Sequence, residues 1–289
     1  MIRVKPILRV LGVLLIMLGG LMWTGLLIAH FYKSGDGQPI FYSGAICLGL
    51  GLPIFLFLKD SRLTLNKREG YLIVALGWFT MVSFSMLPYL ISGVIPTIPE
   101  AFFEAVSGMT TTGASVLTDI ESVSKGILYW RSLTQWIGGM GIIVLTVAIF
   151  PLLGIGGIEL FVAEAPGPTS DKLHPRIQET AKRLWAIYVF LTIILCIILN
   201  LVGMDFYDSV NHALTTMATG GFSTKNASMA HFDVPAIQYS IIFFMFLAGT
   251  NYTIIYYGLK GKIRRVWYSD EFKTYVILVL TLAVIVTAS

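Results

Sequence analysis

The sequence predicts an all-α, polytopic membrane protein built from repeated units, in which a span, a short re-entrant helix and a second span follow one another. Three observations predict this fold: the composition, a series of long apolar runs and an internal repeat. Of the 289 residues, 56% are hydrophobic and only 12% are charged, whereas about 25% of the residues in an ordinary soluble domain are charged. The mean hydropathy of +0.79 likewise excludes an ordinary soluble domain.

Runs of roughly 20 apolar residues are long enough to cross a bilayer as helices. Six expected spans lie near residues 7–29, 40–58, 70–92, 127–152, 183–203 and 236–258, and a seventh run begins near Tyr275. The first run, of about 23 residues, is longer than the apolar segment of a secretory signal peptide, so we expect it to be retained as a span.

Basic residues divide unevenly between the two sides of the membrane that these spans define. Sixteen of the 20 Lys and Arg fall on one side, and the other side keeps only Lys33, Lys125, Arg131 and Lys225. Because cytoplasmic loops are enriched in Lys and Arg, the richer side is expected to be cytoplasmic, with the N-terminus inside. Residues near 97–113 and 205–221 must then enter the membrane from outside and return without crossing it.

Half of the 16 acidic residues fall on the outer side, and these are Asp36, Glu100, Glu104, Asp119, Glu121, Asp205, Asp208 and Asp233. A negative outer mouth would concentrate cations at its entrance. The alternative interpretation is that these residues are ordinary solvated loop carboxylates, some of which cap helices. Arg9 and Arg131 lie near span ends, where long basic side chains can reach the membrane surface.

Two segments recur with an offset of 108 residues, and each contains a short helix followed by a Thr- and Gly-rich strip. Thr97 and Glu100 have the spacing of a capping box, which predicts a helix start. Asp205 is expected to cap the second short helix, and Asp208 holds the place equivalent to Glu100. Each short helix starts outside, so its negative C-terminal end points toward the strip and the membrane centre, which suits a cation.

The two strips are the candidate ion-binding site. They consist of Thr110, Thr111, Thr112 and Gly113 in the first copy, and of Ala218, Thr219, Gly220 and Gly221 in the second. Irregular backbone at membrane depth is tolerated only where protein or a water-filled cavity surrounds it, and its carbonyls can line an ion pathway. Glycine permits backbone conformations that a side chain forbids. The alternative, a tight turn or close packing of small residues, is disfavoured because two strips recur in register.

Gly138, Gly139 and Gly141 lie inside the fourth expected span. Plain helix packing is one interpretation of these glycines, and a kink or a close approach of the short helix is the other. If plain packing applies, alanine in place of Gly139 changes stability by roughly 1 kcal/mol at most.

Motifs for catalysis or metal binding are absent from the sequence, which contains no GxxxxGK[ST] loop, no HExxH and no CxxC pair. The four histidines show no ligand spacing, and His212 is expected to form local hydrogen bonds. Cys47 and Cys196 lie in apolar runs, where we expect them to pack. We therefore expect neither an enzyme nor a bound cofactor, and we expect no nucleic acid among the partners.

Four segments together resemble one known family. Residues 107–115, which include the first strip, resemble the first filter of Trk/Ktr-type potassium uptake proteins, the TrkH family. Residues 130–141 and 163–168 resemble further segments of that family, and residues 218–223 are similar to its second filter. The resemblance covers essentially the whole chain.

The resemblance implies four units of span, pore helix and span in one polypeptide, arranged like a tetrameric potassium channel, with an extra N-terminal pair of spans. It implies potassium as the transported ion, a homodimer in the bacterial cytoplasmic membrane, and cytosolic nucleotide-binding regulatory subunits as partners. This sequence contains only two of the four units, so we expect it to be an N-terminal half.

The expected organisation has five parts. Residues 1–64 form a two-span unit, 65–153 the first unit with a pore loop, 154–182 a cytoplasmic loop, 183–262 the second unit and 263–289 the start of a third. The loop 154–182 suits either a passive connector or a docking surface, because it combines mixed charges with several Pro and Gly residues.

The function expected is uptake of potassium across the cytoplasmic membrane, with the chain as a membrane subunit of a Trk/Ktr-type system. Two alternatives stay open at this point. One is a sodium-permeable or poorly selective cation transporter, and the other is a membrane scaffold whose re-entrant loops conduct nothing. Channel-like flow and coupled transport, such as symport, are not distinguished by the sequence.

Overall fold

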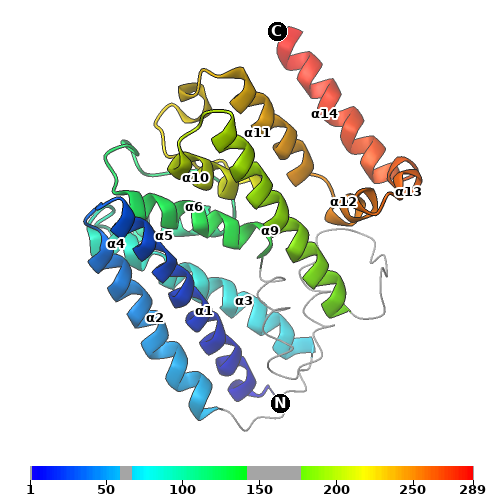
Figure 1. Ribbon diagram of the computed structural model, residues 1–289. Coiled ribbons are helices and arrows are strands. Elements are labelled where there is room, and N and C mark those ends of the chain that lie inside the picture. Colours follow the sequence, from blue (N-terminus) through cyan, green and yellow to red (C-terminus); the bar gives the residue numbers. More distant parts are fainter. Residues whose placement is uncertain (1, 59–66, 142–176, 289) are drawn as a thin grey trace.

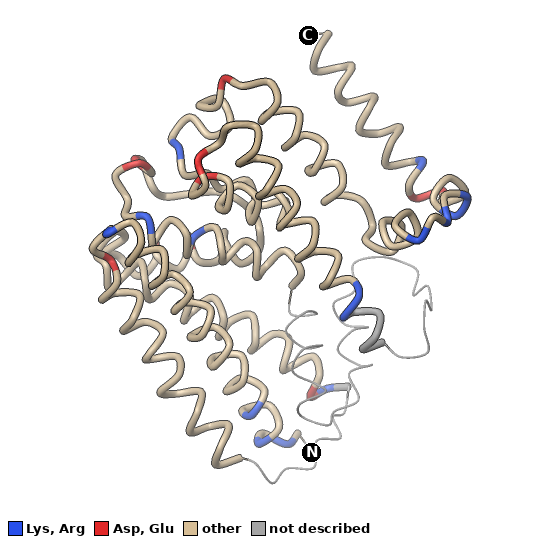
Figure 2. The backbone as a smooth tube through the Cα atoms, viewed as in Figure 1, with Lys and Arg blue, Asp and Glu red and all other residues tan. Residues whose placement is uncertain are grey.

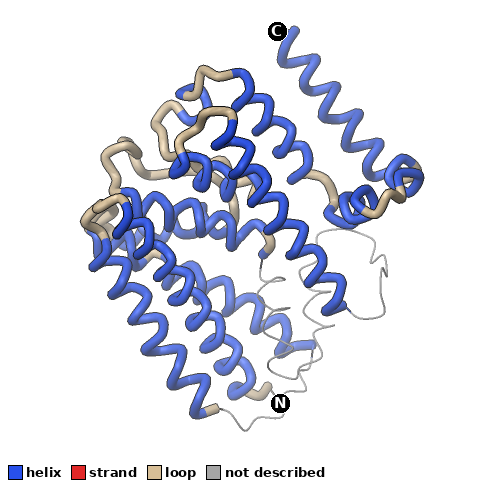
Figure 3. Tube along the Cα trace, viewed as in Figure 1, coloured by secondary structure: helices blue, strands red, loops and turns tan. Residues whose placement is uncertain are grey.

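The computed structural model describes residues 2–58, 67–141 and 177–288. These residues form helices joined by loops, without a strand in the described ranges (Figure 3). Five helical segments are long and apolar enough to cross a membrane, and a bent pair of helices is a sixth candidate. The expected all-α membrane fold is therefore confirmed. Most of the loop 154–182 and the C-terminal part of the fourth expected span, from residue 142 on, lie outside the described residues.

The first two spans are α1 (Val4–Phe31) and α2 (Gly37–Phe57), which lie side by side along their lengths (Figure 1). Their backbones approach closely, since a Cβ on Gly51 would meet the Gly12 carbonyl oxygen at 2.7 Å. In a membrane the hydrophobic effect does not drive helices together, so they associate through close packing, which small residues permit. These two helices match the apolar runs expected at 7–29 and 40–58.

The two repeated units follow the first pair of spans. In the first unit, α3 (Lys67–Ser85) and α4 (Leu87–Ser92) form one span, α5 (Ile98–Met109) is the short helix, and α6 (Lys125–Gly139) begins the return. In the second, the corresponding helices are α9 (Ile177–Leu201), α10 (Phe206–Met217) and α11 (Pro235–Ala248), with a 3₁₀ turn at Ser228–His231.

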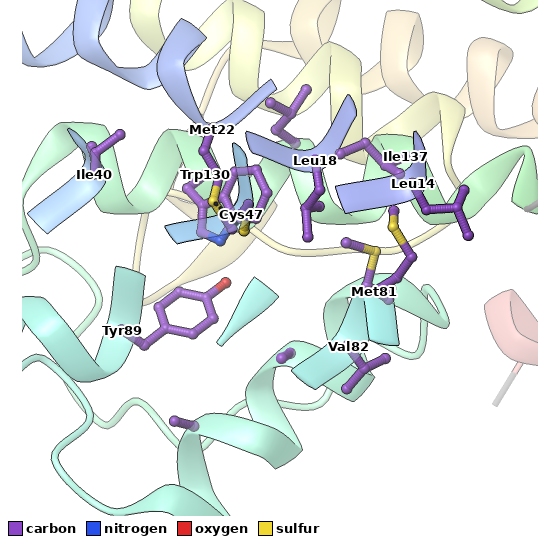
Figure 4. Close-up of a cluster of buried hydrophobic side chains, with 14 of the residues drawn as sticks. Leu14, Leu18, Met22, Ile40, Cys47, Met81, Val82, Tyr89, Trp130 and Ile137 are labelled. Atoms are coloured by element: carbon purple, nitrogen blue, oxygen red, sulfur yellow. Dashed lines mark hydrogen bonds between the residues drawn. The ribbon is translucent and has the colours of Figure 1, made fainter. Parts of the chain in front are cut away.

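A hydrophobic core joins the first unit to the N-terminal pair of spans. Figure 4 shows part of this core, with labelled side chains that α1, α2, α3, α4 and α6 contribute to one buried cluster: Leu14, Leu18, Met22, Ile40, Cys47, Met81, Val82, Tyr89, Trp130 and Ile137. The Trp130 indole N–H donates to the Ser85 carbonyl at 2.9 Å, so this large ring is buried without an unsatisfied donor. The expected packing role of Cys47 is confirmed, because its side chain is fully buried.

The sixth expected span, 236–258, is not one straight helix. After α11 the chain bends by 106° into α12 (Tyr252–Leu259). The Thr250 N–H bonds to Leu247 instead of Phe246, which frees the Phe246 carbonyl to accept from the Tyr275 hydroxyl at 3.1 Å. A hydropathy run cannot reveal such a break, because both arms of the bend are apolar.

The last described helices are α13 (Ile263–Trp267) and α14 (Asp270–Ala288). The seventh expected run thus begins as a helix at Asp270, slightly before Tyr275. In Figure 1, α14 stands away from the other helices, and it has no buried residue.

Charged residues gather toward opposite ends of the helices (Figure 2). Lys and Arg lie at the starts of α1, α3 and α9, whereas acidic residues lie in the loops that precede α6 and α10, at the other end, where a few lysines such as Lys125 also lie. This arrangement places the short helices α5 and α10 at the acidic end of the molecule.

Candidate functional site

The two short helices have identical lengths and equivalent positions. Helices α5 and α10 each contain 12 residues, and both ends of α10 lie 108 residues after those of α5. At 1.5 Å per residue, each helix is about 18 Å long, well short of the roughly 30 Å core of a bilayer. Both helices pack against α6, so the strips that follow them meet at a shared neighbour.

The chain leaves both short helices through the same pair of turns. In the first copy, Thr111 N–H bonds to the Gly108 carbonyl at 3.0 Å and Thr112 N–H bonds to that of Ser107 at 2.9 Å. The second copy repeats these bonds at the same offset and the same lengths, from Thr219 to Thr216 and from Gly220 to Thr215. The repeat that the sequence suggests is therefore a repeat of backbone structure.

Backbone torsions in the two strips also agree. Thr111 and Thr219 have φ angles of 55° and 54°, and Gly113 and Gly221 have φ angles of 79° and 80°. A β-branched residue at positive φ is unusual and costs of order 1–3 kcal/mol, which the surrounding structure must compensate. Because every second residue in this part of each strip is left-handed, successive carbonyls take orientations that do not occur in a regular helix or strand.

The two strips touch each other and share the side chain of Gln135 from α6. A Cβ on Gly113 would collide with the Gly220 carbonyl oxygen, and a Cβ on Gly220 would collide with Gln135. The Gln135 Oε1 accepts from the Phe222 N–H at 3.1 Å, while its Nε2 has no hydrogen-bond partner among the described residues. Gln135 is fully buried, so it holds the second strip from inside the protein.

Of the candidate residues, the structure brings Gly113 and Gly220 into contact across the strips. The hydroxyls of Thr110 and Thr112 are hydrogen-bonded at 2.8 Å, and both residues are exposed. Ala218 is buried beside Gly139 of α6. The remaining three, which adopt positive φ, are Thr111, Thr219 and Gly221.

The glycines of α6 allow the close approach of both units. A Cβ on Gly138 would strike the backbone of Met109, at the end of α5, and one on Gly139 would lie 2.7 Å from the Ala218 Cα. Plain helix packing is thus the wrong interpretation for this pair, because the neighbours are the ends of the two short helices. This packing argues against the expectation that alanine at Gly139 is nearly neutral, because the would-be Cβ lies 2.6 Å from the Tyr188 hydroxyl and 2.7 Å from the Ala218 Cα.

The helix caps are partly as expected. Asp205 caps α10, with its carboxylate accepting from the Tyr207 N–H at 3.0 Å, so that prediction is confirmed. The capping box at Thr97 is wrong in detail, because the Thr97 hydroxyl donates to the Glu100 carboxylate at 2.5 Å and caps no backbone N–H.

The view of the outer carboxylates as solvated loop residues is wrong for three of them. Asp36, Glu104 and Asp208 are buried, with Glu104 fully buried in α5. Arg131, expected near the membrane surface, is 2% exposed and pairs with Glu104 at 2.6 Å. Burial of an unpaired charge is strongly unfavourable, so the two residues compensate each other inside the protein. Asp36 instead accepts from the Ile127 N–H at the start of α6.

The expected local role of His212 is confirmed. Its Nδ1 lies 2.8 Å from the Asp208 carbonyl oxygen and its Nε2 lies 3.0 Å from the Ser223 hydroxyl. These contacts place His212 between its own helix and the outer end of the second strip.

The outer loops of the two units are joined by Asn226. Its side-chain oxygen accepts from the Ile120 N–H at 2.7 Å, and its amide donates to Asp119 at 2.9 Å. The hydrogen bond from Asn226 is the main cause that lowers the pKa of Asp119 below its ordinary value. The loop after the second strip is therefore tied to the loop after the first.

An outer cavity of about 350 Å³ lies beside these loops, and it is lined by Glu121, Val123, Lys125, Leu128, Asp205, Tyr207, Asp208, Thr224 and Lys225. Its acidic groups are partly neutralised, because the Lys225 ammonium lies 3.6 Å from Asp208. The expected negative mouth is thus a mixed lining of carboxylates and ammonium groups.

Gln135, Glu104 and Arg131 are the site residues that the sequence analysis did not assign to the strips. One signal was available for Glu104, which lies 108 residues before His212 and so holds the equivalent place in the repeat. Because His212 was expected to form local hydrogen bonds, this equivalence could have indicated the same role for Glu104. Arg131 and Gln135 lie four residues apart on one face of a helix. Polar residues at this spacing inside an expected span indicate a buried polar face.

Comparison with known proteins identifies the family. The family model described as "Cation transport protein", TrkH, matches residues 37–287. The Trk system potassium uptake protein TrkH of Escherichia coli K12 is 42% identical over 98% of this chain. The Vibrio parahaemolyticus TrkH is 39% identical over 95% of it, and E. coli TrkG is 35% identical over 92%.

A solved structure agrees with these relatives. The crystal structure of the potassium transporter TrkH from Vibrio parahaemolyticus superposes with a TM-score of 0.83 at 36% identity, over 98% of this chain. This chain spans 59% of E. coli TrkH and 58% of the V. parahaemolyticus crystal chain. The matched family model covers both strips and the helices that hold them. The chain therefore belongs to the TrkH family of cation transport proteins.

Proposed function

We propose that this chain takes part in potassium uptake, and that the two strips are two quarters of a carbonyl-lined selectivity filter. The matched backbone of the strips carries this proposal. The φ angles at Thr111 and Thr219 agree within a degree, as do those at Gly113 and Gly221. The recurrence of this backbone behind two short helices of equal length supports a role for its carbonyls in coordinating an ion.

The physical basis is the replacement of water by carbonyl oxygens. A filter carbonyl takes the place of the ion's hydration shell, while the negative C-terminal ends of α5 and α10 favour a cation near the strips. The membrane potential contributes about 2.3 kcal/mol per elementary charge per 100 mV, which drives cation entry into a negative cell interior. Thr110, Thr111, Thr112 and Gly113, with Ala218, Thr219, Gly220 and Gly221, would supply the backbone.

The assembly around the strips is also part of the proposal. Two strips alone cannot surround an ion, so two further units would complete the ring, as the longer relatives allow. By the family resemblance, we propose a homodimer and cytosolic nucleotide-binding regulatory subunits as partners. The loop 154–182, most of which lies outside the described residues, is the proposed docking segment.

We place the protein in the bacterial cytoplasmic membrane with its N-terminus inside. The separation of basic and acidic ends supports this orientation, because positively charged segments stay on the cytoplasmic side (Figure 2). The short helices then start from the outer surface and point inward. With this orientation, potassium that enters from outside would reach the strips before it reaches the cytoplasmic side.

Rubidium uptake tests the proposal. The natural gene is expressed in bacteria that lack their own potassium uptake, with an empty vector as control, and rubidium-86 entry is followed with increasing potassium or sodium outside. The expected result is uptake that potassium suppresses at far lower concentration than sodium. Equal suppression by both ions would favour a poorly selective cation transporter. Absence of uptake above the empty vector would favour a non-conducting scaffold.

A further inference from the structure

A buried ion pair lies directly behind the strips. The Glu104 carboxylate, in α5, is 2.6 Å from the Arg131 guanidinium, in α6, and the side chains are 0% and 3% exposed. A buried pair of this kind often contributes little to stability, because removing two charges from water offsets their attraction. Its place beside the strips therefore points to a role in positioning neighbouring groups.

Glu104 holds the outer end of the first strip. Its Oε1 accepts from the Ser115 hydroxyl at 3.0 Å, and its Oε2 accepts from the Val116 N–H at 2.9 Å. Hydrogen bonds to a charged acceptor are shorter and stronger than neutral ones. The carboxylate thus fixes the residues just after the glycine turn of the first strip.

Arg131 holds the outer end of the second strip. Its Nη1 donates to the Ser223 carbonyl at 3.1 Å, and its guanidinium carbon lies 3.5 Å from the centroid of the Phe222 ring. Contact with an aromatic face adds attraction to a cation, and more so in a desolvated setting. The pair as a whole connects two segments that are more than 100 residues apart in the sequence.

The second unit anchors the outer end of its own strip through two residues of α10, because the Asp208 carboxylate accepts from the Thr224 hydroxyl at 2.6 Å and His212 contacts Ser223. His212 holds the place equivalent to Glu104, and Ser223 holds the place equivalent to Ser115. The His212 Nε2 lies 3.0 Å from the Ser223 hydroxyl, the same length as the bond between Glu104 and Ser115. Ser223 is therefore held twice, at its hydroxyl by its own helix and at its carbonyl by Arg131 of the other unit.

We propose that Glu104 and Arg131 are positioning residues that set the spacing between the two strips, and that this spacing determines ion preference. This inference rests on the proposed function of the strips. Preference between cations depends on where the carbonyls lie and how far they can move. A link that joins the residues directly after both strips through hydrogen bonds limits that movement, although neither side chain needs to touch the ion.

Arg131→Lys separates the two tasks of the guanidinium. Lysine keeps the positive charge for Glu104, but its single ammonium on a flexible stem cannot reproduce the fork that contacts Glu104, Ser223 and the Phe222 ring together. The matched control is Arg264→Lys, at an exposed position in α13. A second variant, Glu104→Gln with Arg131→Gln, removes both charges and so leaves no unpaired charge buried.

The measurement is rubidium uptake against increasing sodium, at equal amounts of protein in the membrane. For Arg131→Lys we expect the preference for rubidium over sodium to fall by about tenfold, which corresponds to about 1.4 kcal/mol of lost discrimination. The neutral double variant should lose at least as much, and Arg264→Lys should behave as the wild type. A purely structural role would lower the amount of protein and the maximal rate but leave this ratio unchanged.

Unchanged preference in membrane-inserted Arg131→Lys would overturn the inference. If that variant does not accumulate, an unchanged ratio in the neutral double variant would overturn it equally. A wild-type protein that transports rubidium without preference over sodium would instead refute the proposed function on which the inference rests, and the two failures are distinct because only the second affects the unmodified protein.

Discussion

Gly113 faces the carbonyl oxygen of Gly220 so closely that a Cβ on Gly113 would collide with it. The two residues belong to different strips, and this contact brings the backbones of the two repeated units directly together. Gly221, the repeat equivalent of Gly113, has nearly the same positive φ, but no atom of the described residues lies within 4 Å of its would-be Cβ. The two equivalent glycines therefore meet different constraints.

This difference predicts unequal effects of alanine at the two positions. Gly221→Ala incurs only the strain of a left-handed conformation, roughly 1–2 kcal/mol. Gly113→Ala adds a collision with a carbonyl that we propose to line the ion path. We therefore expect Gly113→Ala to lower rubidium preference over sodium more than Gly221→Ala does, in competitive uptake at matched protein levels.

Gly49→Ala is the control for both glycine variants. Gly49 lies inside α2, and within the part of the chain that the structure describes no atom lies within 4 Å of its would-be Cβ. Alanine is the better helix former, so the control should keep wild-type uptake and preference. Wild-type selectivity in Gly113→Ala, or a selective loss in Gly49→Ala, would mean that the strips are structural turns.

Gln135 provides a second test of the strips. Gln135→Leu keeps the approximate size of the side chain but removes the acceptor for the buried Phe222 N–H. A buried donor left unsatisfied costs about 1–3 kcal/mol. We expect a lower midpoint of thermal unfolding in detergent, accompanied by weaker preference for rubidium over sodium.

The control for this change is Gln238→Leu, at an exposed position in α11. Its effect on the unfolding midpoint should be small, because water can replace its hydrogen bond to the Phe232 carbonyl. Equal shifts of the midpoint in both variants would show that burial of Gln135 behind the second strip carries no special role.

Gly139 gives a prediction opposite to the one its helix propensity suggests. Alanine there must displace Ala218 or the Tyr188 hydroxyl, both close to the would-be Cβ. Overpacking of a filled site typically costs 1–3 kcal/mol, or roughly that here. We expect Gly139→Ala to give less monodisperse protein on size-exclusion chromatography, whereas Gly20→Ala, with open space in α1, should match the wild type. A Gly139→Ala protein as monodisperse as the wild type would contradict this tight packing.

The strips and the short helices could be predicted from the sequence because their signals are local. A cap at Asp205 and a Thr- and Gly-rich turn are each encoded within a few neighbouring residues. The pairing of Glu104 with Arg131 could not be predicted, because it depends on how α5 packs against α6. Charge sorting by membrane side treats each charge as solvated, so it has no means of recognising a carboxylate buried inside the protein.

The bend after α11 escaped the sequence analysis for a different reason. Hydropathy averages over the whole run, and Gly249, Thr250 and Asn251 lower it too little to divide it. The break is stabilised by a distant partner, the Tyr275 hydroxyl on the Phe246 carbonyl, and locally by Asn251 as the cap of α12. Such freed carbonyls must find partners at membrane depth.

The orientation of the chain gives the last prediction. Single cysteines at Gly35 and Lys225 should react with a membrane-impermeant thiol reagent in intact cells, and one at Arg264 should react only after the cells are opened. The reason is the excess of Lys and Arg on the side that includes Arg264, which the positive-inside rule assigns to the cytoplasm. Gly35 is exposed and Lys225 is 26% exposed, so a label can reach both outer positions.

The unsubstituted chain serves as the control for labelling. Cys47 is buried and Cys196 is partly buried in α9, so background reaction in intact cells should be low. Labelling of the Arg264 position in intact cells, without labelling at Gly35 and Lys225, would invert the topology. The short helices α5 and α10 would then start from the cytoplasm, and their negative C-terminal ends would point outward. A cation that enters from outside would then reach the strips from the side opposite to the one proposed, which would contradict the proposed uptake geometry.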